Sequence, residues 1–427
     1  MRNLENDRQR GITLIALVVT IVVLIILATV SILAVFGDNG IIARAQKAKD
    51  SYSNSQKLED EQMVVLANEM AKYDTKGGSS GENNKPLEPA ELPAGWNGDK
   101  VNPIKSDDNV VVPVPKVYTA STIKEEQSVS SGFVIKEGND GSKTEGINEF
   151  VWIPVSNISD IYDEANNAGQ LWYFGTGSSP KNPAEKLSYP KTQNSVYREP
   201  DVVTGAGGGS DSTSGSYYDA ISTNLQQAGL SASATASDFK TQLQTEFKEM
   251  IDSVKTYGGF YIGRYETGNL SQTKAVVQKN NSDIDSQTWY TQYKLCKTIK
   301  ANENVATSMI WGCQWDATLR WMQTSTNSEV ANFPTNSYGK GNYKGTQGDT
   351  DKLIPTGSNS DYAVNNIYDM AGNVVDWTME AVSVGDRDVR GGVYNSKVSD
   401  YPAGSRYGDH PTDTSSDEGC RSTLYIK

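Results

Sequence analysis

Histidine and cysteine are scarce in this chain of 427 residues, which has one histidine, His410, and three cysteines. A single histidine excludes metal sites built from several histidines and argues against a serine–histidine–aspartate relay. Three cysteines cannot form a disulfide framework, and none of them is spaced as a CxxC metal motif. Positive charge is also in deficit, because 39 lysines and arginines face 52 aspartates and glutamates, for a net charge of −13. A protein this acidic repels polyphosphate, so we expect no nucleic-acid partner.

Aromatic residues and glycine, in contrast, are plentiful. The chain has 22 tyrosines, 8 tryptophans, 8 phenylalanines and 38 glycines. Tyrosine and tryptophan at this density predict a compact, loop-rich domain with a recognition surface.

The N-terminal part of the sequence contains one long apolar run. Residues 12–36 carry no charged side chain, and about 20 such residues are enough to cross a bilayer as a helix. The alternative, a buried helix of a globular domain, would show a polar stripe. Residues 1–11 include three arginines, and positive residues favour the cytoplasmic side of a membrane. We therefore predict a transmembrane helix and a single-pass membrane protein whose C-terminal part is extracellular.

The start of this run carries a more specific signal. Gly11 is followed by the residues ITLIALVV, and this junction resembles the signature of type IV prepilins. The resemblance implies a bacterial cell membrane, cleavage between Gly11 and Ile12 by a prepilin peptidase, and other pilin-like subunits of a pilus as partners. That family usually has glutamate at the fifth mature position, which is Ala16 here. Without a carboxylate to pair with a neighbour's N-terminal amine, the chain is predicted to be a minor, tip-type or membrane-resident component.

Two further segments are expected before the C-terminal domain. Residues 37–74 predict a helical stalk, which either packs against neighbouring helices or forms a solvated spacer. Residues 75–115 hold six of the 15 prolines and five glycines, a composition typical of an extended linker. The C-terminal domain is then residues 116–427.

Within residues 116–427 the pattern changes to short apolar runs separated by turn residues, which is typical of strands. Apolar residues recur at steps of three and four from Phe239 to Val254, which predicts a helix over residues 238–255 that stops at Gly258. The remaining expectations are strands at 132–135, 150–154 and 260–266, a buried helix over 308–322, and a polar loop or surface insertion over 156–235.

Three motifs in the last hundred residues point to a known family. Residues 366–378 read NIYDMAGNVVDWT, residues 390–392 read RGG, and residues 419–421 read GCR. Together they resemble the sulfatase-modifying, formylglycine-generating enzyme family. The resemblance implies an elaborated C-type-lectin-like domain, rich in loops, over residues 116–427. With the long N-terminal transmembrane, pilin-like helix in front of it, the expected fold class is α+β.

The resemblance does not extend to the family's chemistry. Its enzymes bind copper with a pair of cysteines shortly after the RGG strand, and copper(I) needs soft thiolates close together. Here residues 401–407 read YPAGSRY, without cysteine. Relatives that use iron hold it with histidines, and one histidine cannot supply that site. We therefore predict a protein that is not an enzyme, with no catalytic residue and no catalytic cofactor.

The same resemblance raises a metal question at Asn373 and Asp376. The corresponding residues of the family help to hold a structural calcium ion, which needs six to eight oxygen ligands. The two alternatives are therefore a structural calcium at these residues, or side chains that only hydrogen-bond a turn.

Binding is the function that these observations predict. The head would bind an unknown extracellular ligand, a glycan or a protein, as a minor pilin or displayed adhesin. The alternatives are a structural filament subunit, a surface oxidase of the resembled family, and a receptor with a diversified ligand surface. The state of Cys296, Cys313 and Cys420 stays open between three buried thiols and one disulfide with an odd thiol, and the sequence does not choose the pair.

Overall fold

The structure is a computed structural model that describes residues 85–138, 147–187, 221–271, 274–282, 285–300, 302–345, 352–381 and 386–427. All of them belong to the second of two compact units of the chain, residues 79–427. The expected leader (1–11), membrane helix (12–36) and stalk (37–74), with Gly11, Ile12 and Ala16, lie outside the described residues.

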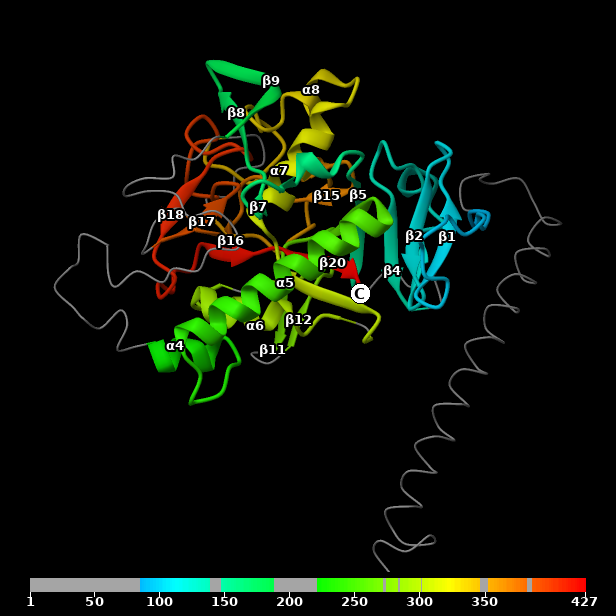
Figure 1. Cartoon of the computed structure of the whole chain (residues 1–427). Helices are drawn as coiled ribbons and strands as arrows, with labels where there is room; N and C mark the ends of the chain where they lie inside the picture. Colours follow the sequence, from blue (N-terminus) through cyan, green and yellow to red (C-terminus); the bar gives the residue numbers. More distant parts are fainter. Residues whose placement is uncertain are drawn as a thin grey trace, which may run out of the picture. The chain divides into compact units, whose positions relative to one another are not determined.

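A six-stranded sheet organises this unit (Figure 1). Each neighbouring pair of its strands is antiparallel. From one edge to the other, its strands are β13 (Val305–Met309), β20 (Ser422–Ile426), β10 (Gly259–Gly263), β5 (Glu149–Pro154), β4 (Val134–Glu137) and β3 (Tyr118–Ala120).

Both faces of this sheet are buried, because successive side chains of a strand point to opposite faces. On β5, Val151 and Ile153 belong to one apolar core, whereas Phe150 and Trp152 belong to another. The longer helices α5 (Ala236–Tyr257), α6 (Trp289–Cys296) and α7 (Gly312–Gln323) contribute to the first core. The strands expected at 132–135, 150–154 and 260–266 correspond to β4, β5 and β10, because continuous apolar runs suit strands that are covered on both faces.

Helix α5 confirms the helix expected over residues 238–255. It begins after Thr235, whose hydroxyl accepts a hydrogen bond from the Asp238 backbone N–H, while the Asp238 carboxylate accepts one from the Thr235 N–H. This reciprocal capping box satisfies two backbone donors that a helix start leaves free. The helix ends at Gly258, which has a φ of 78° and adopts the left-handed conformation that glycine tolerates. The helix expected over 308–322 begins later, at Gly312, because Ser308 and Met309 belong to β13.

A second sheet of four strands lies beside α7. Its order is β18 (Tyr407–Asp409), β17 (Arg387–Arg390), β16 (Val375–Ala381) and β19 (Glu418–Cys420), and the β16–β19 pair is parallel. The remaining pairs of strands are β1 (Val101–Lys105) with β2 (Val111–Pro115), β6 (Tyr162–Asp163) with β7 (Ala168–Gly169), β8 (Trp172–Thr176) with β9 (Ser179–Lys186), β11 (Gly268–Ser271) with β12 (Lys274–Val276), and β14 (Ala363–Val364) with β15 (Ile367–Tyr368). The short helices are η2 (Lys124–Glu126), η3 (Ile158–Asp160), α4 (Ile221–Gln227), α8 (Ser328–Ala331) and η4 (Ser360–Tyr362).

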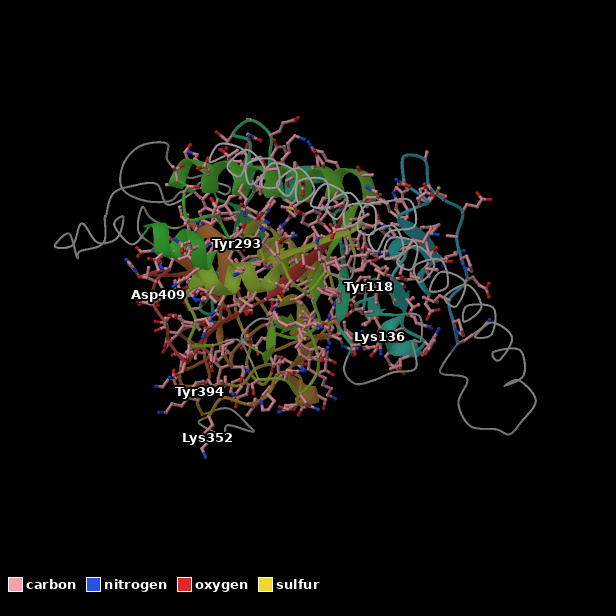
Figure 2. All side chains as sticks on the ribbon, turned by 90° about the horizontal axis from the view of Figure 1, so that it is seen from below. Tyr118, Lys136, Tyr293, Lys352, Tyr394 and Asp409 are labelled. Atoms are coloured by element: carbon pink, nitrogen blue, oxygen red, sulfur yellow. The ribbon has the colours of Figure 1, made fainter. Side chains whose placement is uncertain are left out.

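Four buried charges join the strands at one end of the large sheet. The Arg264 guanidinium lies 2.6 Å from Glu126 and 2.6 Å from Glu149, and the Lys136 ammonium lies 3.3 Å from Glu126. Burial alone would raise the pKa of Glu126, but Arg264 and Lys136 together lower it below its usual value. In Figure 2, Lys136 and Asp409 of β18 lie on opposite sides of the molecule. This balanced set of two cations and two anions therefore lies far from β18.

The expected fold class and location need correction. The described residues contain more strand than helix, and no helix among them is long and apolar enough to cross a membrane. This finding contradicts two expectations. One is an α+β fold led by a long pilin-like helix, and the other is a single-pass protein of the bacterial membrane. The helical patterns behind both lie before residue 85, whereas the later apolar runs are short and end at turn residues.

The N-terminal hairpin also differs from expectation. Residues 75–115 were expected to form an extended linker, yet β1 and β2 pair within this range, with Pro103 opposite Pro113. Val101, Val112 and Val114 are buried in the second core of the large sheet. Proline is tolerated in a two-stranded hairpin because such strands have an edge where no N–H is needed. Residues 156–187, expected as polar loop, likewise contain four short strands.

We predict that this hairpin contributes to the stability of the domain. Val112 is fully buried, whereas Val110, just before β2, is 39% exposed. Val112→Ala should lower the free energy of unfolding by about 2 kcal/mol, through lost burial and an unfilled cavity. Val110→Ala is the matched control and should change it by less than about 0.5 kcal/mol. Urea unfolding measures both, and equal effects of the two variants would restore the linker interpretation.

Candidate functional site: exposed tyrosines over a buried charge cluster

Five charged side chains meet between α7 and the four-stranded sheet, and we call them the charge cluster. Asp316 comes from α7, Glu380 from β16, Asp388 and Arg390 from β17, and Arg406 from the segment before β18. The side chains of the first four have no exposed surface, and that of Arg406 is 18% exposed. Asp388 and Arg390 lie two residues apart on one strand and therefore project to the same face.

The two arginines bridge the three carboxylates. Arg390 lies 2.9 Å from Asp316, 3.5 Å from Asp388 and 3.7 Å from Glu380. Arg406 donates to Glu380 through Nε at 3.1 Å and forms a further ion pair with Asp316. A buried ion pair offsets its cost in desolvation best when its donors and acceptors find partners, and among the described residues only Nε of Arg390 in this cluster finds none. Here one guanidinium reaches three carboxylates and the other reaches two.

The cluster holds one more carboxylate than guanidinium groups. Burial and the neighbouring Glu380 carboxylate raise the pKa of Asp388 well above its usual value, against the opposing effect of Arg390 and Arg406. We therefore expect Asp388 to hold a proton to a higher pH than an ordinary aspartate does. With that proton, two negative charges balance two positive ones, which is the state that a dry interior tolerates best.

The charge cluster ties residues 401–407 to the body of the domain. Arg406 donates to the backbone oxygen of Trp172 on β8 at 2.9 Å, and the Tyr407 N–H donates to Asp388 at 3.1 Å. The Ala403 N–H donates to the Ser337 hydroxyl at 3.0 Å, and the Trp315 ring N–H donates to the Ala403 carbonyl at 2.9 Å. These contacts connect β8, the loop around Ser337 and residues 401–407 to one another.

Those three segments carry every strongly exposed aromatic side chain of the described ranges, and we call the four residues the tyrosine surface. They are Tyr338 (62% exposed), Tyr407 (53%), Tyr173 (41%) and Tyr401 (37%). The rings of Tyr401 and Tyr407 contact each other edge to face, with centroids 6.1 Å apart. Tyr173 follows Trp172, and Tyr338 follows Ser337, so each lies next to a residue that is bonded to the same segment.

The two residues of the calcium alternative bond to different partners. The side-chain amide of Asn373 donates to Glu266 at 2.7 Å, and its oxygen accepts from Asn342 and from the Ile354 N–H, each at 3.1 Å. Asp376 instead faces the Arg421 guanidinium, whose Nε lies 3.3 Å from its Oδ2. Burial raises the pKa of Asp376 to about 6 despite this arginine. Within the described part of the chain, no group of three or more His, Cys, Asp or Glu residues is arranged to hold a metal ion.

Arg421 holds the backbone around Asp376. Its two terminal nitrogens donate to the carbonyls of Gly263, Tyr368 and Asp369 at 2.9–3.0 Å. The GCR motif noticed in the sequence thus places a guanidinium where it joins β10, β15 and β16. The sequence offers one signal for the charge cluster as well, since Glu380 lies between the apolar residues Met379 and Ala381 of β16.

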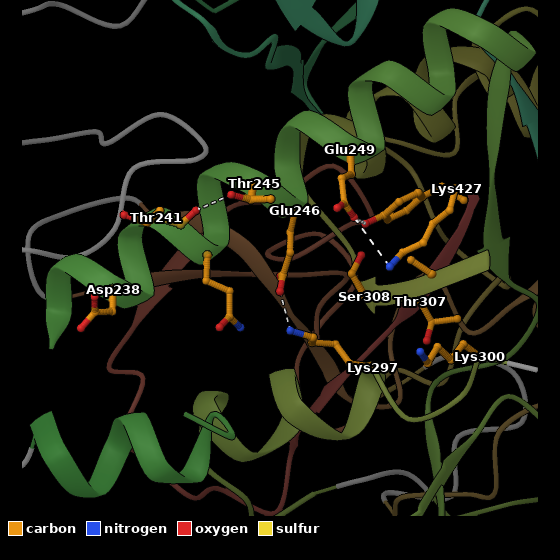
Figure 3. Close-up of a pocket in the computed structure, with 13 residues that line it drawn as sticks. Asp238, Thr241, Thr245, Glu246, Glu249, Lys297, Lys300, Thr307, Ser308 and Lys427 are labelled. Atoms are coloured by element: carbon orange, nitrogen blue, oxygen red, sulfur yellow. Dashed lines mark hydrogen bonds and ion pairs between the residues drawn. The ribbon is translucent and has the colours of Figure 1, made fainter. Parts of the chain in front are cut away.

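A second candidate is an open polar pocket of about 490 Å³ beside α5 (Figure 3). Its charged side chains are largely paired: Glu246 with Lys297, and Glu249 with Lys427 at 4.0 Å. The Thr307 hydroxyl oxygen at its wall is buried and has no hydrogen-bond partner among the described residues.

The proton on Asp388 predicts a pH dependence of stability. Because the folded-state pKa lies above the ordinary value near 3.8, the native state keeps a proton that the unfolded state releases. This contribution is present at low pH and is lost as the pH rises toward the folded-state pKa. As the pH rises from about 4 toward the folded-state pKa, the wild type should therefore lose stability relative to Asp388→Asn, by up to about 1.4 kcal/mol per pH unit.

Urea unfolding across this pH range makes the measurement. The exposed Asp361→Asn variant is the control and should follow the wild type. If Asp388→Asn also keeps the wild-type pH dependence, Asp388 is ionised in the native state and the proton assignment is wrong.

The chain matches no protein family and no curated protein. PvdO from Pseudomonas aeruginosa is similar over 40% of this chain and 82% of its own, with 14% identity and a TM-score of 0.30. CarF is similar over 40% of this chain and 87% of its own, with 16% identity and a TM-score of 0.29. Treponema denticola variable protein 1 is similar over 67% and 98%, with 13% identity and a TM-score of 0.27. Likeness this distant identifies neither fold nor function, and it supports neither the prepilin nor the formylglycine-generating resemblance.

Proposed function

We propose that residues 79–427 form a non-catalytic binding domain that recognises a protein partner through the tyrosine surface. The observation that carries this proposal is that the four exposed tyrosines of the described ranges lie on three segments that are hydrogen-bonded together. Tyrosine is enriched at the centres of protein interfaces, because its ring buries a large area at a low cost in side-chain entropy.

Rigid support favours the same function. An interface loses affinity for each mobile side chain or loop that must be ordered on binding. Residues 401–407 are held by Arg406, by the Tyr407 N–H and by the Ala403 backbone before any partner arrives. The tyrosine rings are therefore presented in a preorganised arrangement.

The acidic residues beside Tyr401 and Tyr407 favour a basic partner at this pair of rings. Asp400 precedes Tyr401, and Asp409 closes the strand that begins with Tyr407. The whole chain carries a net charge of −13. Complementary charge steers association and suppresses wrong partners, and arginine also stacks on tyrosine rings. We therefore expect an arginine- and lysine-rich protein surface as the ligand.

Catalysis by the charge cluster is disfavoured by burial. An acid or base must come within hydrogen-bond distance of the reacting group, yet Asp316, Glu380 and Asp388 have no exposed side-chain surface. Their carboxylates are occupied by Arg390 and Arg406. The cluster acts as a support for the surface above it.

Selection from a random peptide library displayed on phage tests the proposal. Peptides that bind the wild type should be rich in arginine and lysine, and should bind the double variant Tyr401→Ser/Tyr407→Ser at least tenfold more weakly in a titration, because interface tyrosines are common hot spots. Leu92→Ser removes an equally exposed apolar side chain elsewhere and should bind as the wild type does. Selected peptides that bind the double variant with unchanged affinity would contradict the proposal.

The polar pocket beside α5 favours a second candidate, the binding of a glycan. Thr241, Thr245 and Gln242 offer hydroxyl and amide groups at its rim, next to the carboxylates of Glu246 and Glu249. Amide, carboxylate and hydroxyl groups can donate hydrogen bonds to, and accept them from, the hydroxyl groups of a sugar. An array of purified oligosaccharides distinguishes the candidates, since binding lost in Glu249→Gln but kept in Tyr401→Ser/Tyr407→Ser would assign the function to the pocket.

A further inference from the structure

Two of the three cysteines meet in the core although 124 residues separate them. Cys296 is the last residue of α6 and Cys420 is the last residue of β19. Their sulfur atoms lie 3.3 Å apart, and neither side chain is exposed. Cys313 lies on another element, the first turn of α7.

The two sulfurs are brought together by a well-anchored frame. The Trp289 ring N–H on α6 donates to the Thr378 carbonyl on β16 at 2.8 Å, and Gln292 donates to the Glu418 carbonyl on β19 at 3.1 Å. The Thr267 N–H donates to the Cys420 carbonyl at 2.9 Å. Helix α6 is thus fixed against the strand that carries Cys420. Closing the gap to a bond of about 2.05 Å needs a sulfur movement of only about 1 Å, which side-chain rotation supplies.

We propose that Cys296 and Cys420 are a disulfide-forming pair, which a low-molecular-weight disulfide oxidises while the chain folds. The thiolate of one cysteine attacks the oxidant and releases one small thiol, which leaves a mixed disulfide. The second cysteine then attacks the protein sulfur of that mixed disulfide and releases a second small thiol. One S–S bond forms in the protein and one breaks in the oxidant. The two cysteines lose two electrons and two protons, and the oxidant becomes two thiols.

Burial determines when this reaction occurs. Neither sulfur is accessible once α6 has docked, and burial with the adjacent Cys296 raises the pKa of the Cys420 thiol well above its usual value. Because the thiolate is the attacking species, the folded, reduced protein reacts slowly. A folding chain with both thiols in water reacts readily, and the bond is then enclosed.

The cross-link would reach the candidate site through the sheet. Cys420 pairs with Trp377 on β16, the strand that carries Glu380 of the charge cluster. A covalent tie from α6 to β19 therefore restrains the layer that supports the tyrosine surface. This restraint does not depend on what that surface binds.

Refolding of the denatured full-length chain with oxidised or reduced glutathione, followed by denaturing alkylation and mass spectrometry, tests the pair. The wild type should show one alkylated thiol after oxidative refolding and three after reductive refolding, with a linked peptide that contains Cys296 and Cys420. Cys313→Ser is the matched control, with no free thiol and the same linked peptide. Three free thiols after oxidative refolding, or a linkage through Cys313, would overturn the proposal.

Thermal unfolding gives a second readout that survives if one variant folds poorly. The wild type and Cys313→Ser should each melt about 5–10 °C higher after oxidative refolding than after reductive refolding, since the bond closes a long loop of the unfolded chain. Cys296→Ser and Cys420→Ser should each melt at the same temperature after both kinds of refolding. Equal midpoints for the wild type refolded in the two ways would contradict a cross-link between these elements.

Discussion

The charge cluster is the constraint on which the C-terminal half of this domain depends. Two guanidinium groups and three carboxyl groups are buried together. Removing one of them would destabilise the fold, since an unpaired buried charge costs several kcal/mol. Because Asp316, Glu380 and Arg390 come from α7, β16 and β17, the cluster fixes how the helix packs on the small sheet. Arg406 extends the same network outward to β8 and to the segment that presents Tyr401 and Tyr407. Stability and presentation of the tyrosines thus have one physical origin.

Those features that depend on neighbouring residues could be read from the sequence. Helix α5 has an apolar stripe, a capping box and a glycine stop within one window, and β5 and β10 are short apolar runs covered on both faces. The β1–β2 hairpin could not be predicted, because its prolines are typical of a linker and its valines become buried only against strands that are distant in sequence. The patterns before residue 85 lead to a membrane and pilin interpretation that the described residues do not support, since no helix among them could cross a membrane.

The candidate site could not be predicted from the sequence, because its contacts join residues that are distant in the chain. Arg406 pairs with Asp316 across 90 residues, and Cys296 meets Cys420 across 124, so no local spacing indicates either contact. Asn373 and Asp376 are the opposite case, because they are close in sequence but bond to different partners. Asn373 has a φ of 66° in a turn, while Asp376 lies on β16 and faces Arg421. The abundance of tyrosine did predict a recognition surface, but which four rings remain exposed is decided by the tertiary packing.

Native-state hydrogen exchange of an Arg406→Met variant tests most directly whether the charge cluster presents the tyrosines. Met keeps most of the apolar length of the side chain and removes its bonds to Glu380, Asp316 and the Trp172 carbonyl. The amides of Ala403 and Tyr407 should then exchange at least tenfold faster, while those of Tyr261 and Ile262 in β10 keep their wild-type rates relative to global unfolding. Lys297→Met is the control, since Lys297 is also a partly buried, paired cation but contacts Glu246 on α5 instead. Unchanged protection at Ala403 and Tyr407 in Arg406→Met would contradict the account.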